Sequence, residues 1–164
     1  MRKASFYLII TIFMLACNAD SNETTADTKS DSTAFDLQTA RSLIESENAK
    51  FSDEMKKGDS VALGSHYASD GWLMFSNSEP IKGKDIVSAW GSVIRTGIKD
   101  VRLTTLDLTG NAELLAETGT YEMFGENNAA IDKGKYVVIW KPENGNWKIY
   151  RDIGNSNLPP PPVK

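Results

Sequence analysis

The sequence predicts an α+β domain, because the spacing of its apolar residues changes once along the chain. Before about residue 97, apolar residues recur every three or four positions, as they do in helices that bury one face. After Lys99 they alternate with polar residues, as in strands, over four segments separated by short turns. Helices followed by a meander of antiparallel strands are typical of a fold in which the helices cover one face of a curved sheet.

The composition is that of one ordinary globular domain. The chain has 164 residues, of which 40% are hydrophobic and 24% are charged, which is enough for a single core. Its 18 basic and 22 acidic residues give a formal net charge of −4 without any basic stretch, which disfavours nucleic-acid binding. The single histidine, His66, and the single cysteine, Cys17, exclude an intrachain disulfide and zinc sites built from several such residues. We expect no metal and no cofactor.

Residues 1–16 are predicted to be a cleaved lipoprotein signal peptide. Arg2 and Lys3 precede a 13-residue apolar stretch that is too short to span a bilayer. The stretch ends in MLAC, which resembles a bacterial lipobox whose cysteine, here Cys17, is lipidated and becomes the N-terminus. The alternative is an ordinary secretory signal followed by a chance cysteine. The lipobox interpretation places the protein in the bacterial cell envelope, anchored to the lipid bilayer through Cys17 and facing the periplasm or the cell surface.

Residues 17–34 are predicted to be a disordered tether. Apart from the lipidated cysteine they contain no apolar side chain larger than alanine, so they cannot form a core. The folded domain is expected over residues 35–158. A Pro-rich tail over residues 159–164 follows it, because four consecutive prolines cannot continue a sheet.

Three helices are predicted in the first part of the domain. Asp36 can cap a first helix that ends at Gly58. The buried stripe of this helix is Leu37, Ala40, Ile44, Asn48, Phe51 and Met55. Asp59 can cap a short second helix that runs through Tyr67, and a third helix is expected over residues 83–96.

One short strand over residues 72–75 precedes the third helix, and four longer strands follow it. The longer strands are expected over residues 99–109, 113–124, 135–141 and 147–153. In the first of them the alternation changes phase, which predicts a β-bulge near Thr104 and Thr105. Asn144-Gly145 favours a tight hairpin before the last strand.

The strand around residues 136–140 predicts how the chain associates. These residues read Tyr-Val-Val-Ile-Trp, so both faces of the strand are apolar. A sheet with one face in water would not have this pattern. We therefore expect a second copy of the chain to cover the outer face in a symmetric homodimer. The alternative is that the helices and the tail cover enough of that face.

Six short phrases occur in a fixed order on the predicted elements. They are FSDEMKKGD at 51–59, YASD at 67–70, GKDI at 83–86, ETGTY at 117–121, GKY at 134–136 and WKIYRDI at 147–153. They span about residues 36–157 and resemble the nuclear transport factor 2-like superfamily, which includes SnoaL-like polyketide cyclases and ketosteroid isomerases. The match is best to a branch of unknown function. The resemblance implies a cone-shaped, cystatin-like fold, in which three N-terminal helices cover a curved antiparallel sheet and a pocket lies between the first helix and the concave face.

The resemblance implies no particular activity, because one fold hosts many functions. Ketosteroid isomerases use an aspartate base and an oxyanion hole formed by a tyrosine and a protonated aspartate. The corresponding positions here are Phe51, Phe75 and either Val137 or Val138, which are all apolar. Ketosteroid isomerase chemistry is therefore not expected. Gly154 stands where this branch often has tryptophan, which implies a more open pocket rim.

Two polar residues stand where the pattern favours apolar ones. Asn48 lies in the buried stripe of the first helix, so its amide either bonds a nearby backbone group or points into a polar cavity. Glu117 shares a strand face with Tyr121, and Gly119 leaves room beside it. Pointing inward, Glu117 would be a candidate proton acceptor. The alternative is a solvated carboxylate at the open end of the strand.

Arg151 and Asp152 are neighbours on one strand, so they point to opposite faces. Asp152 inside would be a candidate base, whereas the apolar periodicity of the strand favours Arg151 inside, as an anion-binding group. The candidate aromatic walls of a pocket, or core residues, are Tyr67, Trp72 and Tyr121. His66 is expected at the surface or as a cap at the end of the second helix.

Three functions fit these residues, and the sequence favours the first. It is the binding, without chemistry, of a small hydrophobic or amphiphilic molecule or of a partner. The second is a cofactor-free isomerase, cyclase or hydratase, with Asp152 or Glu117 as base and Asn48, Tyr121 or Arg151 holding the developing charge. The third is a dimeric structural module whose cone is filled. An inward carboxylate would favour the enzyme, and a cavity lined only by apolar groups and Asn48 would favour binding.

Overall fold

The computed structural model describes residues 35–159. The predicted signal peptide, the lipidated Cys17, the tether over 17–34 and residues 160–164 of the predicted tail lie outside the described residues. Within the described part, no helix has both the length and the apolar character needed to cross a membrane.

Three helices form the N-terminal side of the domain: α1 (Leu37–Lys57), α2 (Ser60–Ser65) and α3 (Asp85–Arg95). As predicted, Asp36 caps α1, and its carboxylate accepts hydrogen bonds from the backbone N–H groups of Gln38 and Thr39. The helix ends at Gly58, whose left-handed φ of 69° suits glycine. The second helix is shorter than predicted, because Tyr67 belongs to the strand that follows it.

Six strands form one sheet in the order β2-β1-β6-β5-β4-β3. They are β1 (Tyr67–Met74), β2 (Ile81–Lys82), β3 (Asp100–Gly110), β4 (Leu115–Phe124), β5 (Ala130–Glu143) and β6 (Asn146–Ser156), with a 3₁₀ turn, η1 (Glu126–Asn128), before β5. The last four form the predicted antiparallel meander. However, β1 lies parallel to β6, so the sheet is mixed rather than purely antiparallel. The two strands are joined through the whole intervening chain, so no hairpin fixes their relative direction.

Strand ends account for most differences from the predicted elements. The start of β1 reads Tyr-Ala-Ser-Asp-Gly, which resembles a turn in composition, although it lies within the bounds of the strand. Tyr67 and Trp72 pair with β6, and the register shifts between them. The β3 bulge falls between Thr105 and Asp107, next to the predicted position. In the hairpin between β5 and β6, Asn144 and Gly145 have φ of 52° and 77°, as a two-residue type I′ turn requires.

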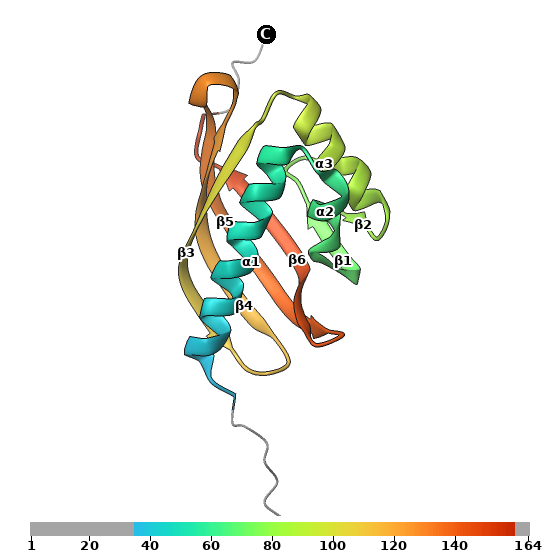
Figure 1. Cartoon of the computed structure of the whole chain (residues 1–164), viewed down its shortest axis with the longest axis vertical. Coiled ribbons are helices and arrows are strands. Elements are labelled where there is room, and N and C mark those ends of the chain that lie inside the picture. Colours follow the sequence, from blue (N-terminus) through green and yellow to red (C-terminus); the bar gives the residue numbers. More distant parts are fainter. Residues whose placement is uncertain (1–34, 160–164) are drawn as a thin grey trace, which may run out of the picture. The chain divides into compact units, whose positions relative to one another are not determined.

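The helices cover one face of the sheet, which is the inner face (Figure 1). The first helix packs along β3, and α2 packs against α3 at the β1 side. The buried residues of α1 are Ala40, Ile44, Asn48, Phe51 and Met55, which are five of the six predicted stripe residues. The sixth, Leu37, is exposed because it lies in the first turn of the helix.

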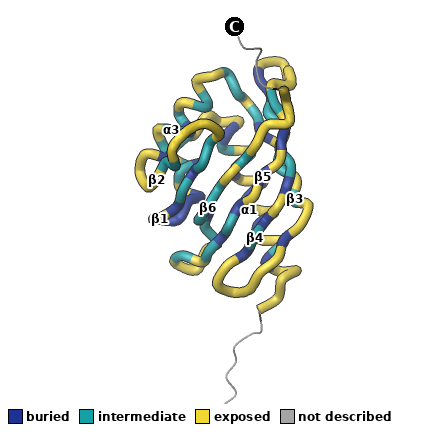
Figure 2. Tube along the Cα trace, turned by 180° about the vertical axis from the view of Figure 1, so that it is seen from behind, coloured by how far each residue is buried: buried dark blue, intermediate teal, exposed yellow. Residues whose placement is uncertain are grey.

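The outer face of the sheet has no helix over it within residues 35–159 (Figure 2). Val137 and Ile153 pair across β5 and β6 on this face and are 40% and 42% exposed. Together with the half-buried Ile139, they form an apolar spot between polar neighbours. The homodimer that would cover this spot stays a prediction.

Candidate functional site

A cavity of about 130 Å³ lies between the helices and the inner face of the sheet. Its lining residues are Asn48, Phe51, Leu73, Met74, Phe75, Trp90, Val101, Leu103, Tyr121, Met123, Tyr136, Val138, Trp140, Ile149, Asp152 and Gly154. Apart from the indoles, only Asn48, Asp152 and the two tyrosines bring polar groups. A dry engineered cavity of about 150 Å³ holds one benzene molecule. This cavity is therefore of the size of a single small ring.

Asp152 is the acid in the cavity wall. It projects from β6 opposite Leu73 of β1, and its Oδ2 atom accepts a hydrogen bond of 2.5 Å from the Tyr67 hydroxyl. Its Oδ1 atom has no hydrogen-bond partner in the described part of the chain. Burial, which outweighs the lowering effect of the Tyr67 hydrogen bond, and the nearby charge of Glu117 together raise the pKa of Asp152 to about 6. The structure thus places Asp152, and not Arg151, on the inner face.

A β-bulge explains why the strand pattern pointed to the wrong neighbour. Ile139 pairs with Arg151, but Trp140 pairs with Ile149, so Tyr150 is an extra residue in β6. Before the bulge, Ile149 faces inward, and strict alternation would bring Arg151 inward too. The extra residue reverses the alternation, which turns Arg151 outward and Asp152 inward.

The wall behind Asp152 contains Tyr67 and Trp90, of which only Trp90 lines the cavity, so the expectation that Tyr67 lines the pocket is wrong. Burial, followed by the charge of Asp152, raises the pKa of the Tyr67 hydroxyl well above its usual range, so this hydroxyl stays a donor. The indole Nε1 of Trp90 is buried and has no hydrogen-bond partner within residues 35–159. It lies near the Tyr67 hydroxyl, whose pKa it lowers. This wall therefore fixes one oxygen of Asp152 and leaves the other free.

Glu117 is fully buried behind Asn48 and Tyr136, two residues that line the cavity. Its Oε1 atom accepts hydrogen bonds from Asn48 Nδ2 at 2.7 Å, Thr105 Oγ1 at 2.6 Å and the Tyr136 hydroxyl at 2.7 Å. Its Oε2 atom accepts one from Trp140 Nε1 at 2.9 Å. Four neutral donors thus satisfy both carboxylate oxygens. The alternative of a solvated carboxylate is therefore wrong.

Asn48 reaches the cavity from α1 and bonds side chains rather than the backbone. Besides its bond to Glu117, its amide nitrogen lies 3.3 Å from Thr105 Oγ1. Asn48 also borders a second, more polar hollow of about 280 Å³ between α1 and β3. One amide thus separates the apolar cavity from a surface hollow.

Two glycines on β4 and β5 make room for two tyrosines of the site. Gly119 pairs with Tyr136, and Gly134 pairs with Tyr121. A Cβ atom on Gly119 would lie 2.3 Å from the Tyr136 ring, and one on Gly134 would lie 2.5 Å from the Tyr121 ring. Each ring therefore lies directly over the glycine opposite it. Tyr136 occupies the room beside Gly119. Burial, and then the charge of Glu117, raise the pKa of Tyr136 far above its usual range.

Tyr121 lines the cavity, as predicted for an aromatic wall, and its hydroxyl donates to Asp132 Oδ2 at 3.0 Å. Burial raises the pKa of Tyr121 to about 12. Within residues 35–159, no group of three or more His, Cys, Asp or Glu side chains is arranged to hold a metal ion.

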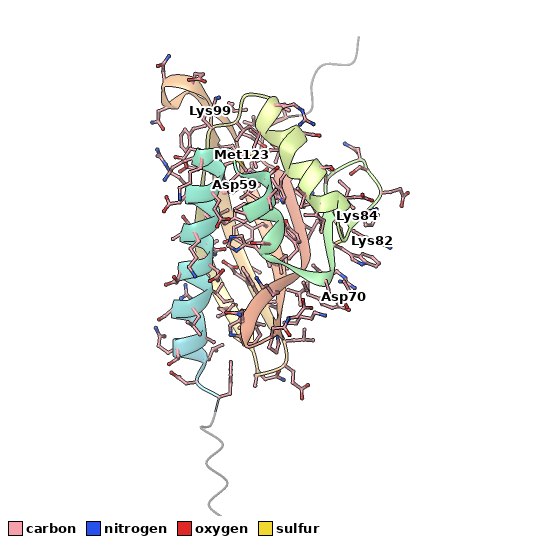
Figure 3. The ribbon with its side chains drawn as sticks, turned by 45° about the vertical axis from the view of Figure 1, so that its right-hand side comes forward. Asp59, Asp70, Lys82, Lys84, Lys99 and Met123 are labelled. Carbon is pink, nitrogen blue, oxygen red and sulfur yellow. The ribbon has the colours of Figure 1, made fainter. Side chains whose placement is uncertain are left out.

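Arg151 and Trp72 lie together on the outer face, away from the cavity. The guanidinium of Arg151 lies 4.2 Å from the centre of the Trp72 ring and 3.6 Å from that of Tyr150. Lys82 of β2 covers Trp72 at 3.8 Å. Figure 3 shows Lys82 at the β1–β2 edge, whereas Met123, a lining residue, lies between the helices and the sheet. The expectation that Arg151 and Trp72 belong to the pocket is therefore wrong.

His66 is a buried link between the first helix and β1. It follows α2 as its C-cap, as one alternative predicted, but its side chain is only 5% exposed. Its Nε2 lies 2.8 Å from Glu54 Oε2, and its Nδ1 lies 3.2 Å from Glu47 Oε2. The ring also meets Phe51 edge-on at 5.4 Å. The surface location expected for His66 is wrong, because its side chain is buried beside two glutamates of α1 and bonds to one of them, Glu54.

The positions that correspond to ketosteroid isomerase catalytic residues are apolar and line the cavity. Phe51, Phe75 and Val138 all contribute to its wall. Val137 points to the outer face. The acid of this cavity, Asp152, therefore stands at a position that does not correspond to any of the ketosteroid isomerase catalytic residues.

Sequence reasoning missed four residues of the site: Thr105, Trp90, Tyr136 and Trp140. Tyr136 and Trp140 alternate with Val138, so the strand pattern could have placed them inward together with it. Thr105 lies next to the β3 bulge, where alternation gives no orientation. Trp90 was placed in the core of the third helix, and only the structure brings it next to Tyr67 and Asp152.

Comparison with known proteins shows the fold. No protein-family model matches the chain, and no curated protein matches it in sequence. Among solved structures, a domain of unknown function with a cystatin-like fold from Nostoc punctiforme aligns with a TM-score of 0.66 and 11% identity, over 76% of this chain and 82% of that one. A nuclear transport factor 2-like protein with a cystatin-like fold from Novosphingobium aromaticivorans aligns with a TM-score of 0.61 and 15% identity, over 72% and 82%.

One similar structure is an enzyme. The hexachlorocyclohexane dehydrochlorinase of Novosphingobium barchaimii aligns with a TM-score of 0.59 and 18% identity, over 74% of this chain and 88% of that one. At these identities the similarity shows a common fold and no more. The domain therefore has the nuclear transport factor 2-like, cystatin-like fold that its sequence resembles.

Proposed function

We propose that this nuclear transport factor 2-like domain binds one small, mostly apolar molecule in its cone and holds a polar group of that molecule at Asp152. The observation that carries the proposal is the cavity itself. It has an apolar and aromatic wall and a single accessible carboxylate oxygen, Asp152 Oδ1. Apolar pockets with a few placed polar groups are the usual form of small-molecule sites. A purely structural module would fill this space with side chains.

The polar parts of the site support binding because they are held before any ligand arrives. Tyr67 fixes one oxygen of Asp152, and Glu117 fixes Asn48 and Tyr136. A ligand therefore orders few side chains, which reduces the entropic cost of binding.

A cavity-filling variant tests the proposal. A side chain at Gly154 would enter the cavity, and a Cβ atom there meets only ordinary contacts, the nearest at 3.6 Å from Tyr121. We expect the Gly154→Leu variant to lose at least about ten-fold in affinity for cyclopentanol, measured by NMR titration, because the side chain fills the space. Asn155→Leu, at the exposed next position, should bind as the wild type does. Equal binding by all three proteins would contradict the proposal.

A second candidate function is cofactor-free proton transfer with Asp152 as the general base. The specific observation is a carboxylate whose pKa of about 6 lies close to neutral pH, with one oxygen facing an apolar cavity. The similarity to a dehydrochlorinase supports this candidate only in that the same fold hosts chemistry on a small apolar molecule.

Deuterium exchange into a small ketone would test this second function. If Asp152 acts as a base, the protein should catalyse incorporation of deuterium from D₂O next to the carbonyl of cyclopentanone. The rate should rise through about pH 6 as Asp152 ionises, and Asp152→Asn should abolish it. Binding of cyclopentanone without deuterium exchange would be consistent with the binding function and would contradict the proton-transfer function.

We also propose that the domain acts at the bacterial cell envelope, anchored through Cys17. The support is in the sequence: a basic start, a short apolar stretch and a lipobox-like MLAC. The Cys17→Ser variant should leave the membrane fraction, whereas a variant at the neighbouring Asn18 should stay in it. Retention of Cys17→Ser would contradict the anchor.

A further inference from the structure

We propose that the molecule bound in the cone is a small organic cation, a protonated amine with an apolar body of about five or six carbons. This inference rests on the proposed function and names the class of its ligand. Three features of the cavity carry it: the sign of the charges around it, the rings in its wall, and the free oxygen of Asp152.

The charges at the cavity are all negative. Asp152 is part of the wall, and Glu117 lies behind Asn48 and Tyr136, which also line it. None of the lining residues is lysine, arginine or histidine. Every hydrogen-bond donor to the two carboxylates in the described part of the chain is neutral. A buried carboxylate without a countercharge costs desolvation free energy. A bound cation would supply the countercharge that no lining side chain provides.

The elements packed around Asp152 bring no lysine, arginine or histidine side chain into the lining of the cavity. Tyr67 faces it from β1, Glu117 acts on it from β4, and Tyr136 lies near it on β5. From the helices, the lining residues are Asn48, Phe51 and Trp90, which carry no charge. No group among these competes with an ammonium for Asp152.

The wall is suited to hold a cation once the charges attract it. The aromatic side chains that line the cavity are Phe51, Phe75, Trp90, Tyr121, Tyr136 and Trp140. Trp90 packs edge-on against Phe51 and Phe75, and the centre of its ring lies 5.1 Å and 6.0 Å from theirs. These contacts hold the three rings in place. Ammonium groups bind to aromatic rings by cation–π attraction, more strongly where water is excluded. A neutral molecule would use the same rings, so the preference for a cation comes from the carboxylates.

Asp152 offers one oriented acceptor to such a ligand. Its Oδ2 atom is held by Tyr67, and its Oδ1 atom is free. An ammonium N–H that donates to Oδ1 would form a charge-assisted hydrogen bond, which is about twice as strong as a neutral one. The cavity of about 130 Å³ then leaves room for one small ring or a short branched chain.

A matched pair of ligands separates this inference from the proposed function. Cyclopentylamine and cyclopentanol have the same ring and nearly the same size, and only the amine is a cation at pH 7.5. We expect the purified full chain to bind the amine at least about ten-fold more tightly than the alcohol in calorimetric titrations at pH 7.5, a difference of about 1.4 kcal/mol. At pH 5, below the raised pKa of Asp152, the amine should lose about ten-fold in affinity, and the alcohol should change little.

Variants assign the preference to Asp152. Asp152→Asn should bind the two ligands about equally, whereas Asp70→Asn, at an exposed carboxylate that pairs with Lys141, should keep the preference. The loss of affinity at pH 5 is measured on the wild type, so it tests the same point if Asp152→Asn does not fold. Alcohol binding as tight as amine binding would overturn the cation and leave the proposed function intact. A preference that survives in Asp152→Asn would overturn the role of Asp152. Binding of neither ligand would contradict the proposed function as well.

Discussion

At the scale of single residues, Asp152 should make the stability of the domain depend on pH. Its pKa rises from an ordinary 3.8 to about 6 on folding, so between these values the folded state holds a proton that the unfolded state has released. Stability therefore falls as pH rises from about 4 to about 6, by roughly 2–3 kcal/mol, and this contribution stays lost above pH 6.

The Asp152→Asn variant checks this dependence, because asparagine can still accept the Tyr67 hydrogen bond but does not ionise. We expect it to be about 2–3 kcal/mol more stable than the wild type at pH 7.5 and about equally stable at pH 4, in urea denaturation. The other acids are the same in both proteins, so the difference in their unfolding free energies reports the titration of Asp152. A difference that does not change between pH 4 and pH 7.5 would show that Asp152 does not titrate in this range.

Glu117 should be the acid on which the fold depends most. Replacing it with glutamine puts an amide nitrogen, which cannot accept, among four buried donors. We expect Glu117→Gln to lose about 3 kcal/mol or more in the free energy of unfolding, because at least one buried donor is left without an acceptor. Glu122→Gln, on the exposed face of the same strand, should change stability by less than about 0.5 kcal/mol. Similar losses in both variants would argue against the buried network.

The sequence identified these residues for one reason: a polar side chain in an apolar pattern is visible without a structure. Asn48 and Glu117 were found in this way, and both prove to be buried and bonded to each other. The choice between Arg151 and Asp152 could not be made, because the extra residue Tyr150 reverses the alternation of β6. A bulge of one residue leaves no clear signal in a single sequence.

At the scale of elements, the glycine–tyrosine pairs between β4 and β5 should shape the cavity. We expect Gly119→Ala to destabilise the domain by about 2 kcal/mol or more, because the new Cβ atom would clash with the Tyr136 ring and with the backbone oxygen of Thr104. Gly154→Ala should be tolerated within about 1 kcal/mol, because the nearest atom is 3.6 Å away. Thermal unfolding of both variants gives the comparison. A tolerated Gly119→Ala would mean that Tyr136 can leave its place at little cost.

Local signals predicted the helices better than the strands. The ends of α1 follow from Asp36 and Gly58 alone, because capping depends on neighbours in the chain. The parallel pairing of β1 with β6 depends on residues about 80 positions apart, and no local pattern encodes it. The first half of β1 also lacks strand-like alternation, which is why Tyr67 was assigned to a helix.

At the scale of the whole molecule, the exposed spot on the outer face predicts how the chain associates. If a second copy covers Val137 and Ile153, the full chain should sediment as a dimer at micromolar concentration, and Val137→Asp should sediment as a monomer. Leu106→Asp makes the same change at a 63% exposed leucine in the bulge of the edge strand β3 and should leave the dimer intact. A wild-type mass of one chain would contradict the dimer.

The parallel pairing of β1 and β6 also determines when a newly made chain can fold. The first strand of the domain forms its inner hydrogen bonds with the last one, so nearly the whole domain must be present before β1 can pair with β6. Until then, the residues of the cavity on β1 and β6 are not assembled. Folding of the cavity therefore waits for the C-terminal strand, and a chain that ends before Ile149 has no assembled cavity, however complete its helices are.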